Sequence, residues 1–293
     1  MRAILMTLSA CLVVAAAWAA PAPEVKQELL IVSNRTGKPE IFRMNADGTG
    51  VKNLTNSKSL NINPVWSPDR RKIAFASDRD GVMNIYVMDH DGKNVKQLTK
   101  GAEVSRVPTW SKDGKKIAFM RATNRGTFIF TMDGDGGNVK QITNQDAYDP
   151  AWSPDGKKIL FTSLRGGAGF RLYVMDPDGS NVQQLTTNAN RIGFVYPSWS
   201  PDGKKIAWTD LVNNTLEIFT ADADGKNAKQ VTKLGGTNTY AAWSPDGKKI
   251  AFHHSANPNS GIYYVMDADG KNRKEFLKNE PPIEGGRIVW RPK

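Results

Sequence analysis

Residues 243–252 read Trp-Ser-Pro-Asp-Gly-Lys-Lys-Ile-Ala-Phe, and close copies of this stretch recur along the 293-residue chain. Tryptophans mark the copies at intervals of 42 to 47 residues; they are Trp66, Trp110, Trp152, Trp199, Trp243 and Trp290. A period of this length, filled with short alternating apolar runs, is typical of one four-stranded blade of a β-propeller. The repeat therefore predicts an all-β fold.

Each period carries four strand signals, which we name A to D from the axis to the rim. In the first full period they are Trp66 itself and residues 72–75, 85–88 and 95–99, separated by turns rich in Gly, Pro and Asp. Side chains alternate along a strand, so the Ile and Phe of the Ile-Ala-Phe run should face one side and the Ala the other. We expect each repeated Trp to fill the wedge between neighbouring blades.

The two ends of the chain predict how the ring closes. The N-terminal segment offers strands B, C and D at Leu29 to Ser33, Glu40 to Asn45 and Val51 to Thr55, whereas the C-terminal segment offers only strand A, at Arg287 to Arg291. Together they complete one blade and remove open sheet edges. The prediction is a six-bladed β-propeller over residues 28–293, with four antiparallel strands per blade and the first blade closed by the C-terminal strand.

The N-terminus predicts export. Arg2 precedes an apolar run that ends in Ala17-Trp18-Ala19, a small-x-small cleavage pattern, so residues 1–19 are expected to be a signal peptide and residues 20–27 a short linker. The expected location is the periplasm or outside the cell, with no stable membrane insertion after cleavage. An uncleaved anchor is one alternative. Lipidation of Cys11 is another, because residues 8–11 match a lipobox.

Charge and cysteine content narrow the function classes. The formal net charge is +11, which attracts anionic partners without specificity. Export makes nucleic acid an unexpected partner. Cys11 is the only cysteine, so cleavage after Ala19 leaves no thiol for catalysis or for a disulfide. We expect a monomer.

The unit of residues 243–252, followed by Tyr-Val-Met-Asp-Ala-Asp-Gly at 264–270, resembles the TolB-type propeller repeat, a PD40 or WD40-like repeat. The resemblance covers about residues 28–293. It implies a propeller and a role in the cell envelope, with binding of the peptidoglycan-associated lipoprotein or a similar protein. The α/β domain that precedes the propeller in TolB is not expected, because only residues 20–27 lie between signal and propeller. Similar repeats occur in prolyl-oligopeptidase-like peptidases, so a separate gate for a peptidase is a further hypothesis.

A search for catalytic residues finds no Gly-x-Ser-x-Gly nucleophile motif. His90 lies in a turn, and the adjacent residues His253 and His254 should point to opposite faces of a strand, where they cannot hold one ion together. The Asp-x-Asp-Gly-x-Asn turn at 267–272 is similar to a calcium loop but lacks the later bidentate acid. We predict no catalytic residue, no metal site and no cofactor.

The turns on the two faces of the propeller differ in how strongly they vary between blades. The A–B and C–D turns are nearly identical between blades, and their Lys-Lys pairs alternate with Asp turns, as expected of a solvated face of mixed charge. The B–C and D–A loops vary, and binding residues tend to lie on such loops. Three residues before each Trp, at the expected mouth of the hub, the residue type changes from blade to blade.

Arg and Tyr dominate interface hot spots, so we predict a partner-binding cluster on this face. Its members are Arg35, Arg79, Arg106, Tyr148, Asp149, Arg165, Arg191, Tyr196, Tyr240 and Arg287. For the arginines of the B–C loops, an equally weighted interpretation is a turn consensus, Ser-x-Arg-x-Gly, in which Arg bonds the backbone. The function hypothesis is a binding or scaffolding propeller without catalysis. The alternative is a hydrolase or lyase that acts on an acidic glycan or lactone at the hub.

Overall fold

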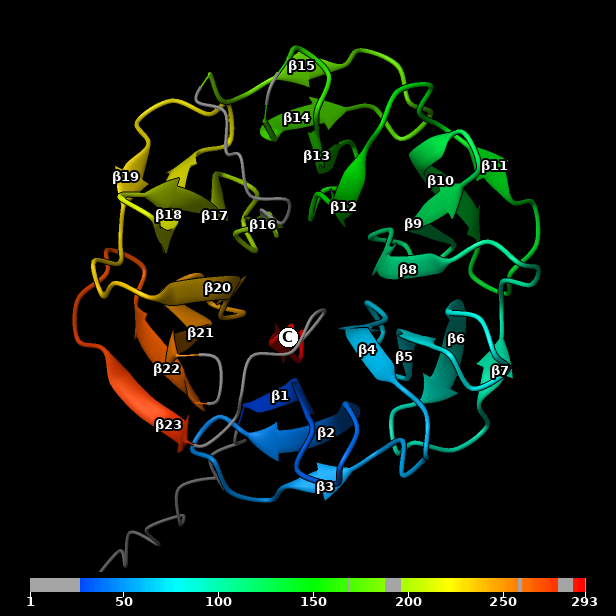
Figure 1. The fold of residues 1–293 in the computed structure, drawn as a ribbon, viewed down its shortest axis with the longest axis horizontal. Helices are drawn as coiled ribbons and strands as arrows, with labels where there is room; N and C mark the ends of the chain where they lie inside the picture. The colour runs from blue at the N-terminus through cyan, green and yellow to red at the C-terminus, as the bar shows by residue number, and fades with distance from the viewer. Residues whose placement is uncertain (1–26, 168, 188–195, 258–259, 279–286, 293) are drawn as a thin grey trace, which may run out of the picture.

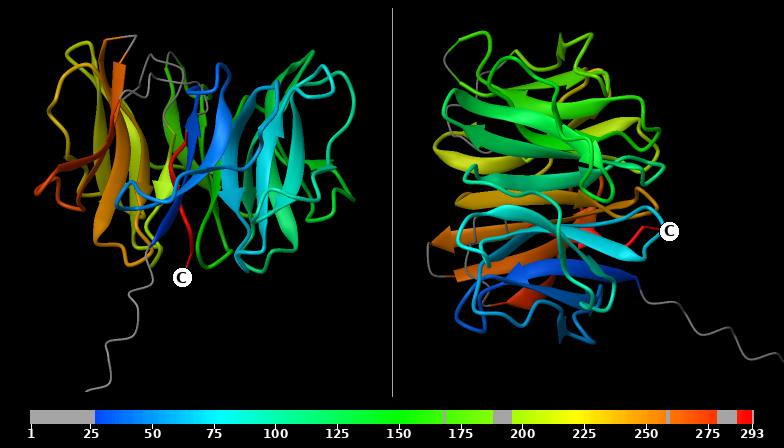
Figure 2. Two further views of the ribbon diagram at one scale, coloured as in Figure 1. Left: turned by 90° about the horizontal axis from the view of Figure 1, so that it is seen from below. Right: turned by 90° about the vertical axis from the view of Figure 1, so that its right-hand side faces the viewer.

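A computed structural model of the chain describes residues 27–167, 169–187, 196–257, 260–278 and 287–292. Its β-sheets stand like blades in a ring around a central axis (Figure 1). The strands run between the two faces of this ring (Figure 2). The fold is therefore an all-β propeller, as the repeat predicts.

Four of the sheets are separate four-stranded blades whose inner strand lies nearest the axis. The first consists of β24 (Val289–Trp290), β1 (Glu28–Ser33), β2 (Glu40–Asn45) and β3 (Lys52–Asn53). The second consists of β4 (Asn61–Trp66), β5 (Lys72–Ser77), β6 (Asn84–Asp89) and β7 (Lys96–Gln97). The third consists of β8 (Ser105–Trp110), β9 (Lys116–Thr123), β10 (Gly126–Asp133) and β11 (Lys140–Gln141). The fourth consists of β12 (Tyr148–Trp152), β13 (Ile159–Ser163), β14 (Arg171–Met175) and β15 (Gln183–Gln184).

The remaining strands form one eight-stranded sheet, and this corrects the predicted six-bladed arrangement. Its first antiparallel group is β16 (Ser198–Trp199), β17 (Lys205–Val212), β18 (Thr215–Asp222) and β19 (Lys229–Gln230). Its second group is β20 (Thr237–Trp243), β21 (Lys249–Asn257), β22 (Ser260–Asp267) and β23 (Lys274–Lys278). The structure thus has four separate four-stranded blades and not six, because the last two repeats share a single hydrogen-bonded sheet.

The two groups join where β18 meets β20. Leu216 pairs in parallel with Thr237, and the Leu216 amide donates to the Gly236 carbonyl at 2.9 Å. The buried carboxylate of Glu217 accepts hydrogen bonds from the amides of Leu234 at 3.2 Å and Gly235 at 2.9 Å. These contacts draw the connection that leads into β20 onto the edge of β18.

The predicted closure of the first blade is confirmed. β24 pairs antiparallel with β1, with Trp290 opposite Leu29 and Val289 opposite Leu30. At the junction between the last repeat and the first blade, the phenol of Tyr263 on β22 donates to the carbonyl of Val32 on β1 at 3.2 Å. The ends of the chain therefore hold the ring together.

Packing between sheets follows the predicted alternation. Phe119 of β9 is buried in a cluster with residues of the second blade, whereas the adjacent Ala118 packs with residues of the fourth blade. The repeated Trp side chains contribute to this packing to different degrees, because Trp152 and Trp199 are half-buried and the other four are buried. Trp66 is buried, but Trp152 is half-buried, and its indole N–H donates to the Gly156 carbonyl of its own turn at 3.1 Å.

The glycines of the C–D turns set the distance between sheets. A Cβ added at any of them would meet a carbonyl oxygen of the preceding repeat, or of the last repeat in the case of the first blade. They are Gly48, Gly92, Gly136, Gly179, Gly225 and Gly270. All have positive φ, between 83° and 98°. The glycine at this position is thus needed for the turn and for the contact.

Candidate functional site

The residues three positions before five of the repeated tryptophans share an unusual backbone. Asn63, Val107, Asp149, Tyr196 and Tyr240 all have positive φ, between 44° and 60°. The strand register shifts at this point in β4, β8, β12 and β20, as expected of a β-bulge. Positive φ is costly for a side chain with a Cβ, most of all for a β-branched residue such as Val. The bulge interrupts strand alternation in these four strands.

Two contacts link predicted site residues at the hub. The Arg287 Nη2 atom lies 3.5 Å from Asp149 Oδ1, although Arg287 precedes β24 and Asp149 is on β12. The Tyr240 hydroxyl donates to the Tyr196 hydroxyl at 3.2 Å, and the two ring centroids are 4.3 Å apart. Asp149, Tyr196 and Tyr240 are all buried. The structure thus brings together four of the predicted site residues.

Burial keeps Tyr196 neutral. Burial raises the pKa of Tyr196 far above its usual value, with further contributions from Tyr240 and from the negative charge of Asp149, and the charge of Arg287 opposes them. The phenol of Tyr196 is therefore a neutral hydrogen-bonding group at physiological pH.

A cavity of about 250 Å³ lies in the hub beside these groups. Tyr196, Tyr240 and Arg287 line one part of it. Its other walls come from the inner strands and the adjoining A–B turn; they include Pro64, Pro108, Trp152, Pro154, Pro197 and Ile288. The cavity is thus mainly apolar with a few convergent polar groups, as is common for ligand sites.

Tyr148 and Arg106 lie next to the hub ring on β12 and β8. Tyr148 packs edge-on against Phe170, with ring centroids 5.2 Å apart. Burial raises the pKa of Tyr148, and the charge of Asp146 adds to this effect. Arg106 is half-buried beside Val107. Arg191 lies outside the described residues, so its predicted role stays a prediction.

The arginines of the B–C loops make contacts within their own blades. Arg35, Arg79 and Arg165 each donate through Nε to the Ser two positions earlier, at 2.9 to 3.1 Å. Their guanidinium carbons lie 4.8 to 5.0 Å from the ring centroids of Phe42, Tyr86 and Phe161. Both contacts stabilise the loop. The structure does not bring these three arginines to the hub cavity. The turn interpretation expected a bond to a backbone carbonyl, whereas their Nε atoms donate to Ser hydroxyls.

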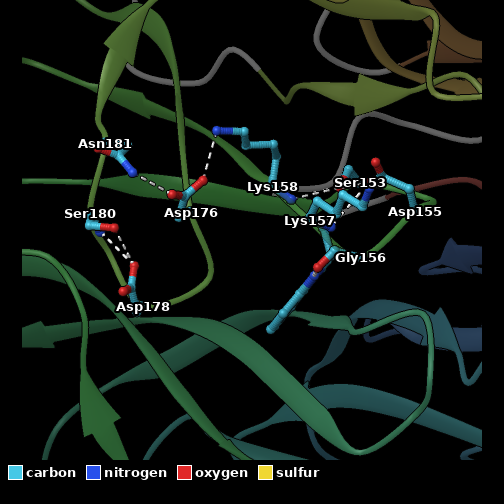
Figure 3. Close-up of polar contacts among 10 residues, drawn as sticks. Ser153, Asp155, Gly156, Lys157, Lys158, Asp176, Asp178, Ser180 and Asn181 are labelled. Carbon is cyan, nitrogen blue, oxygen red and sulfur yellow. Dashed lines mark hydrogen bonds and ion pairs between the residues drawn. The ribbon is translucent and has the colours of Figure 1, made fainter.

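The Asp-x-Asp-Gly turns are explained by hydrogen bonds. In Figure 3, Asp176 accepts from Lys158 Nζ at 2.7 Å and from Asn181 Nδ2 at 2.6 Å. Asp178 accepts from the amide and the hydroxyl of Ser180, at 2.9 and 2.6 Å. The same Lys–Asp pairing recurs in other repeats at 3.0 to 3.4 Å. These hydrogen bonds explain the Asp and Asn residues of the turns without a bound metal ion.

The histidines of β21 face opposite sides, as predicted. His253 is buried edge-on against Tyr263, with ring centroids 5.0 Å apart. His254 Nδ1 lies 3.0 Å from Asn238 Oδ1, and burial, followed by the charge of Arg273, lowers the pKa of His254. Among the residues that the structure describes, no group of three His, Cys, Asp or Glu side chains could hold a metal ion.

Glu217 was not among the predicted site residues. Besides the two amides already described, its carboxylate accepts from Thr232 Oγ1 at 2.6 Å and Asn238 Nδ2 at 3.2 Å. Glu40 stands at the equivalent start of strand C in the first blade and accepts from the Ser57 amide at 2.8 Å. Two repeats carry a Glu at the same position, and this repeated acid is the sequence pattern that could have been noticed. It indicates a side chain that holds the following loop in place.

No helix within the described ranges has the length and apolar character to cross a membrane.

Comparison with known proteins gives matches over most of the chain. The profile of the family described as "TolB beta propeller domain" matches residues 11–168 and 168–285. The protein TolB homolog of Chlorobaculum tepidum is 45% identical over 47 residues. These residues are 16% of this chain and only 11% of that relative.

Solved structures give a similar result. TolB from Acinetobacter baumannii has a TM-score of 0.76 at 26% identity, over 91% of this chain and 67% of that one. The putative TolB from Agrobacterium tumefaciens has a TM-score of 0.70 at 20% identity, over 92% and 99%. An oligogalacturonate lyase from Vibrio parahaemolyticus has a TM-score of 0.55 at 15% identity, over 87% and 73%. The last two likenesses show the fold alone.

Proposed function

We propose that this chain, which belongs to the TolB beta-propeller domain family, is an exported propeller that recruits a protein or peptide partner at its hub and has no catalytic activity. The observation that carries the proposal is the ring of residues with positive φ. These positions repeat one backbone conformation within the chain, but their side chains differ as Asn, Val, Asp and Tyr. This combination is expected of a recognition surface. A purely structural position would carry the same residue in every repeat.

The chemistry of the ring supports binding more than turnover. Tyr196 and Tyr240 supply rigid aromatic surface with a polar tip, the residue type most often found at interface hot spots. Asp149 Oδ1 lies 3.5 Å from Arg287 Nη2, so its carboxyl group is paired with a cation. A general base would instead need a group poised to take a proton near neutral pH. No specific contact favours the hydrolase or lyase alternative.

The proposed location is the periplasm, and the proposed partner is an envelope protein such as a peptidoglycan-associated lipoprotein, bound by a monomeric propeller. The expected signal, residues 1–19, lies outside the described residues. N-terminal sequencing of the exported protein should begin at Ala20. A mature protein that begins at a lipidated Cys11 would replace cleavage after Ala19 with an anchored form.

Affinity capture from detergent-solubilised envelope extract tests the proposal. The mature chain is compared with a variant that carries Tyr148→Ala, Tyr196→Ala, Tyr240→Ala and Arg287→Ala. A control variant carries Val95→Ala, Val139→Ala and Val182→Ala, which alters exposed side chains of the C–D turns. Circular dichroism and melting temperatures establish that each variant is folded.

The expected result is a specific protein retained by the mature chain and by the valine control but lost by the folded hub variant. Equal capture by all three would remove the hub assignment. Capture by the mature chain and the hub variant, but not by the valine control, would place the binding surface elsewhere.

A further inference from the structure

The hub cavity has two chemically different parts. Its walls are largely apolar; Pro64 and Pro108 lie on separate inner strands, and Pro197 directly precedes β16. Tyr196, Tyr240 and Arg287 bring polar groups together in one part of it, and Thr109 and Ser198 also line it. With a volume of about 250 Å³, it is below the usual range of about 300–1,000 Å³ for sites that hold drug-sized ligands. The group that enters it must therefore be small, with an apolar body and one polar end.

Arg287 defines what that polar end should be. Its Nε and Nη2 atoms are buried and make no hydrogen bond to any described residue. The distance of 3.5 Å from Nη2 to Asp149 Oδ1 permits an ion pair but exceeds ordinary hydrogen-bond lengths. Nε and Nη2 form one edge of the guanidinium plane, and a carboxylate can accept from both at once. Buried donors of this kind normally have an acceptor.

We propose that the hub cavity binds a carboxylate carried on a short apolar stem, with the carboxylate on the Nε–Nη2 edge of Arg287. This inference rests on the proposed function, because it names the group that a peptide partner would insert. The apolar stem lies against the prolines and Trp152, where removal from water favours binding. Asp149 competes with the ligand for Arg287 and limits its affinity.

Small probes test this inference without any partner protein. The probe is 3-phenylpropionate, and its neutral counterpart is 3-phenylpropionamide. Both are titrated into the mature chain, with the dissociation constant measured by calorimetry and by shifts of the Trp indole N–H resonances. We expect the acid to bind at least tenfold more tightly than the amide. Equal affinities, or no binding of the acid at millimolar concentration, would overturn the proposal.

Variants locate the contact. Arg287→Gln should abolish the difference between acid and amide, whereas Arg125→Gln, which removes an exposed guanidinium that does not line the cavity, should keep it. Asp149→Asn should tighten acid binding at least fivefold, because it removes the competing carboxylate. This gain cannot arise from misfolding. Weaker acid binding by Asp149→Asn, or an unchanged preference in Arg287→Gln, would overturn the assignment.

Three peptides distinguish the source of the carboxylate, and the pattern of results separates this inference from the proposed function. Peptides that end in Ala-Phe with a free or an amidated C-terminus report whether a chain end enters the cavity, and a peptide with an internal Glu reports on a side chain. If the probes bind and envelope capture fails, the carboxylate site stands and the recruitment proposal falls. If capture at the hub succeeds and the probes fail, recruitment stands and the carboxylate site falls.

Discussion

Gly179 of the fourth blade packs directly against the carbonyl oxygen of Ile142 in the third, so closely that a Cβ on Gly179 would overlap that oxygen. The same contact recurs at the other C–D turns, including the one between Gly48 and Phe276 that spans the seam of the ring. The repeated Asp-x-Asp-Gly turn therefore holds neighbouring sheets together in addition to closing a hairpin.

Replacing Gly179 by Ala should destabilise the fold by about 2–4 kcal/mol, because backbone strain and steric overlap add. Gly37→Ala is the matched control, since Gly37 has a similar φ of 98° but open space around the added Cβ. It should cost only about 1–2 kcal/mol for the left-handed backbone. Urea denaturation measures both. Equal losses would mean that the contact with Ile142 adds nothing.

The sequence was sufficient for much of the fold because the determinants are local and repeated. The bounds of β2 match the predicted Glu40 to Asn45, and the pairing of β24 with β1 follows from the strands missing at each end. The joining of β18 to β20 was not predictable in this way. It depends on the long hairpin strands β17 and β18 and on Glu217, whose partners are 15 to 21 residues away.

The candidate site was predictable only in part. Counting three residues back from each Trp gave the hub ring, because the repeat fixes that position. The contact between Asp149 and Arg287 joins residues 138 positions apart on different blades, and no local pattern indicates it. The Ser-x-Arg-x-Gly motif was ambiguous because a loop consensus and a binding loop use the same residues. The stacking of Arg79 over Tyr86 is visible only in the structure and could not be predicted from the sequence.

The repeated tryptophans should not be equivalent. Trp66→Ala should cost about 3–5 kcal/mol, because Trp66 is buried in the cluster between the first two repeats. Trp152→Ala should cost about 1–2 kcal/mol, because Trp152 is only half-buried beside the hub cavity. Denaturant midpoints of the two variants provide the comparison. A larger loss for Trp152→Ala would show that the indole in the cavity wall supports the fold.

Glu217→Gln should destabilise the fold by about 1–3 kcal/mol. Its carboxylate accepts from two amides, a hydroxyl and a side-chain amide, and a Gln side chain would turn an NH₂ group toward some of these donors. Glu103→Gln is the control, because Glu103 is exposed, and its effect should be within about 0.5 kcal/mol. Hydrogen exchange of the Leu234 and Gly235 amides should also accelerate in Glu217→Gln. Unchanged exchange would contradict the role of Glu217 as a loop anchor.

Stability should fall in acid. Hydrogen bonds from Lys158 and then Asn181 lower the pKa of Asp176 in the folded state, and Asn227 and Lys205 do the same for Asp222. A depressed carboxyl pKa contributes stability above the unfolded pKa of about 4, and this contribution is lost as the pH falls through the folded pKa. Melting temperatures between pH 7 and pH 2 should therefore decline below about pH 4.

Asp176→Asn combined with Asp222→Asn should lower the melting temperature at pH 7 and flatten the decline in acid, because these two sites no longer titrate. A decline as steep as in the unchanged chain would mean that other carboxyl groups control the acid response.

Photo-crosslinking in living cells tests the central claim, recruitment at the hub, most directly. A benzoylphenylalanine replaces Tyr148 beside the hub ring in one strain and Val139, an exposed residue of a C–D turn, in another. The account predicts a discrete adduct with an envelope protein from position 148 and none from position 139. Adducts from position 139 alone, or the same adduct from both positions, would contradict it.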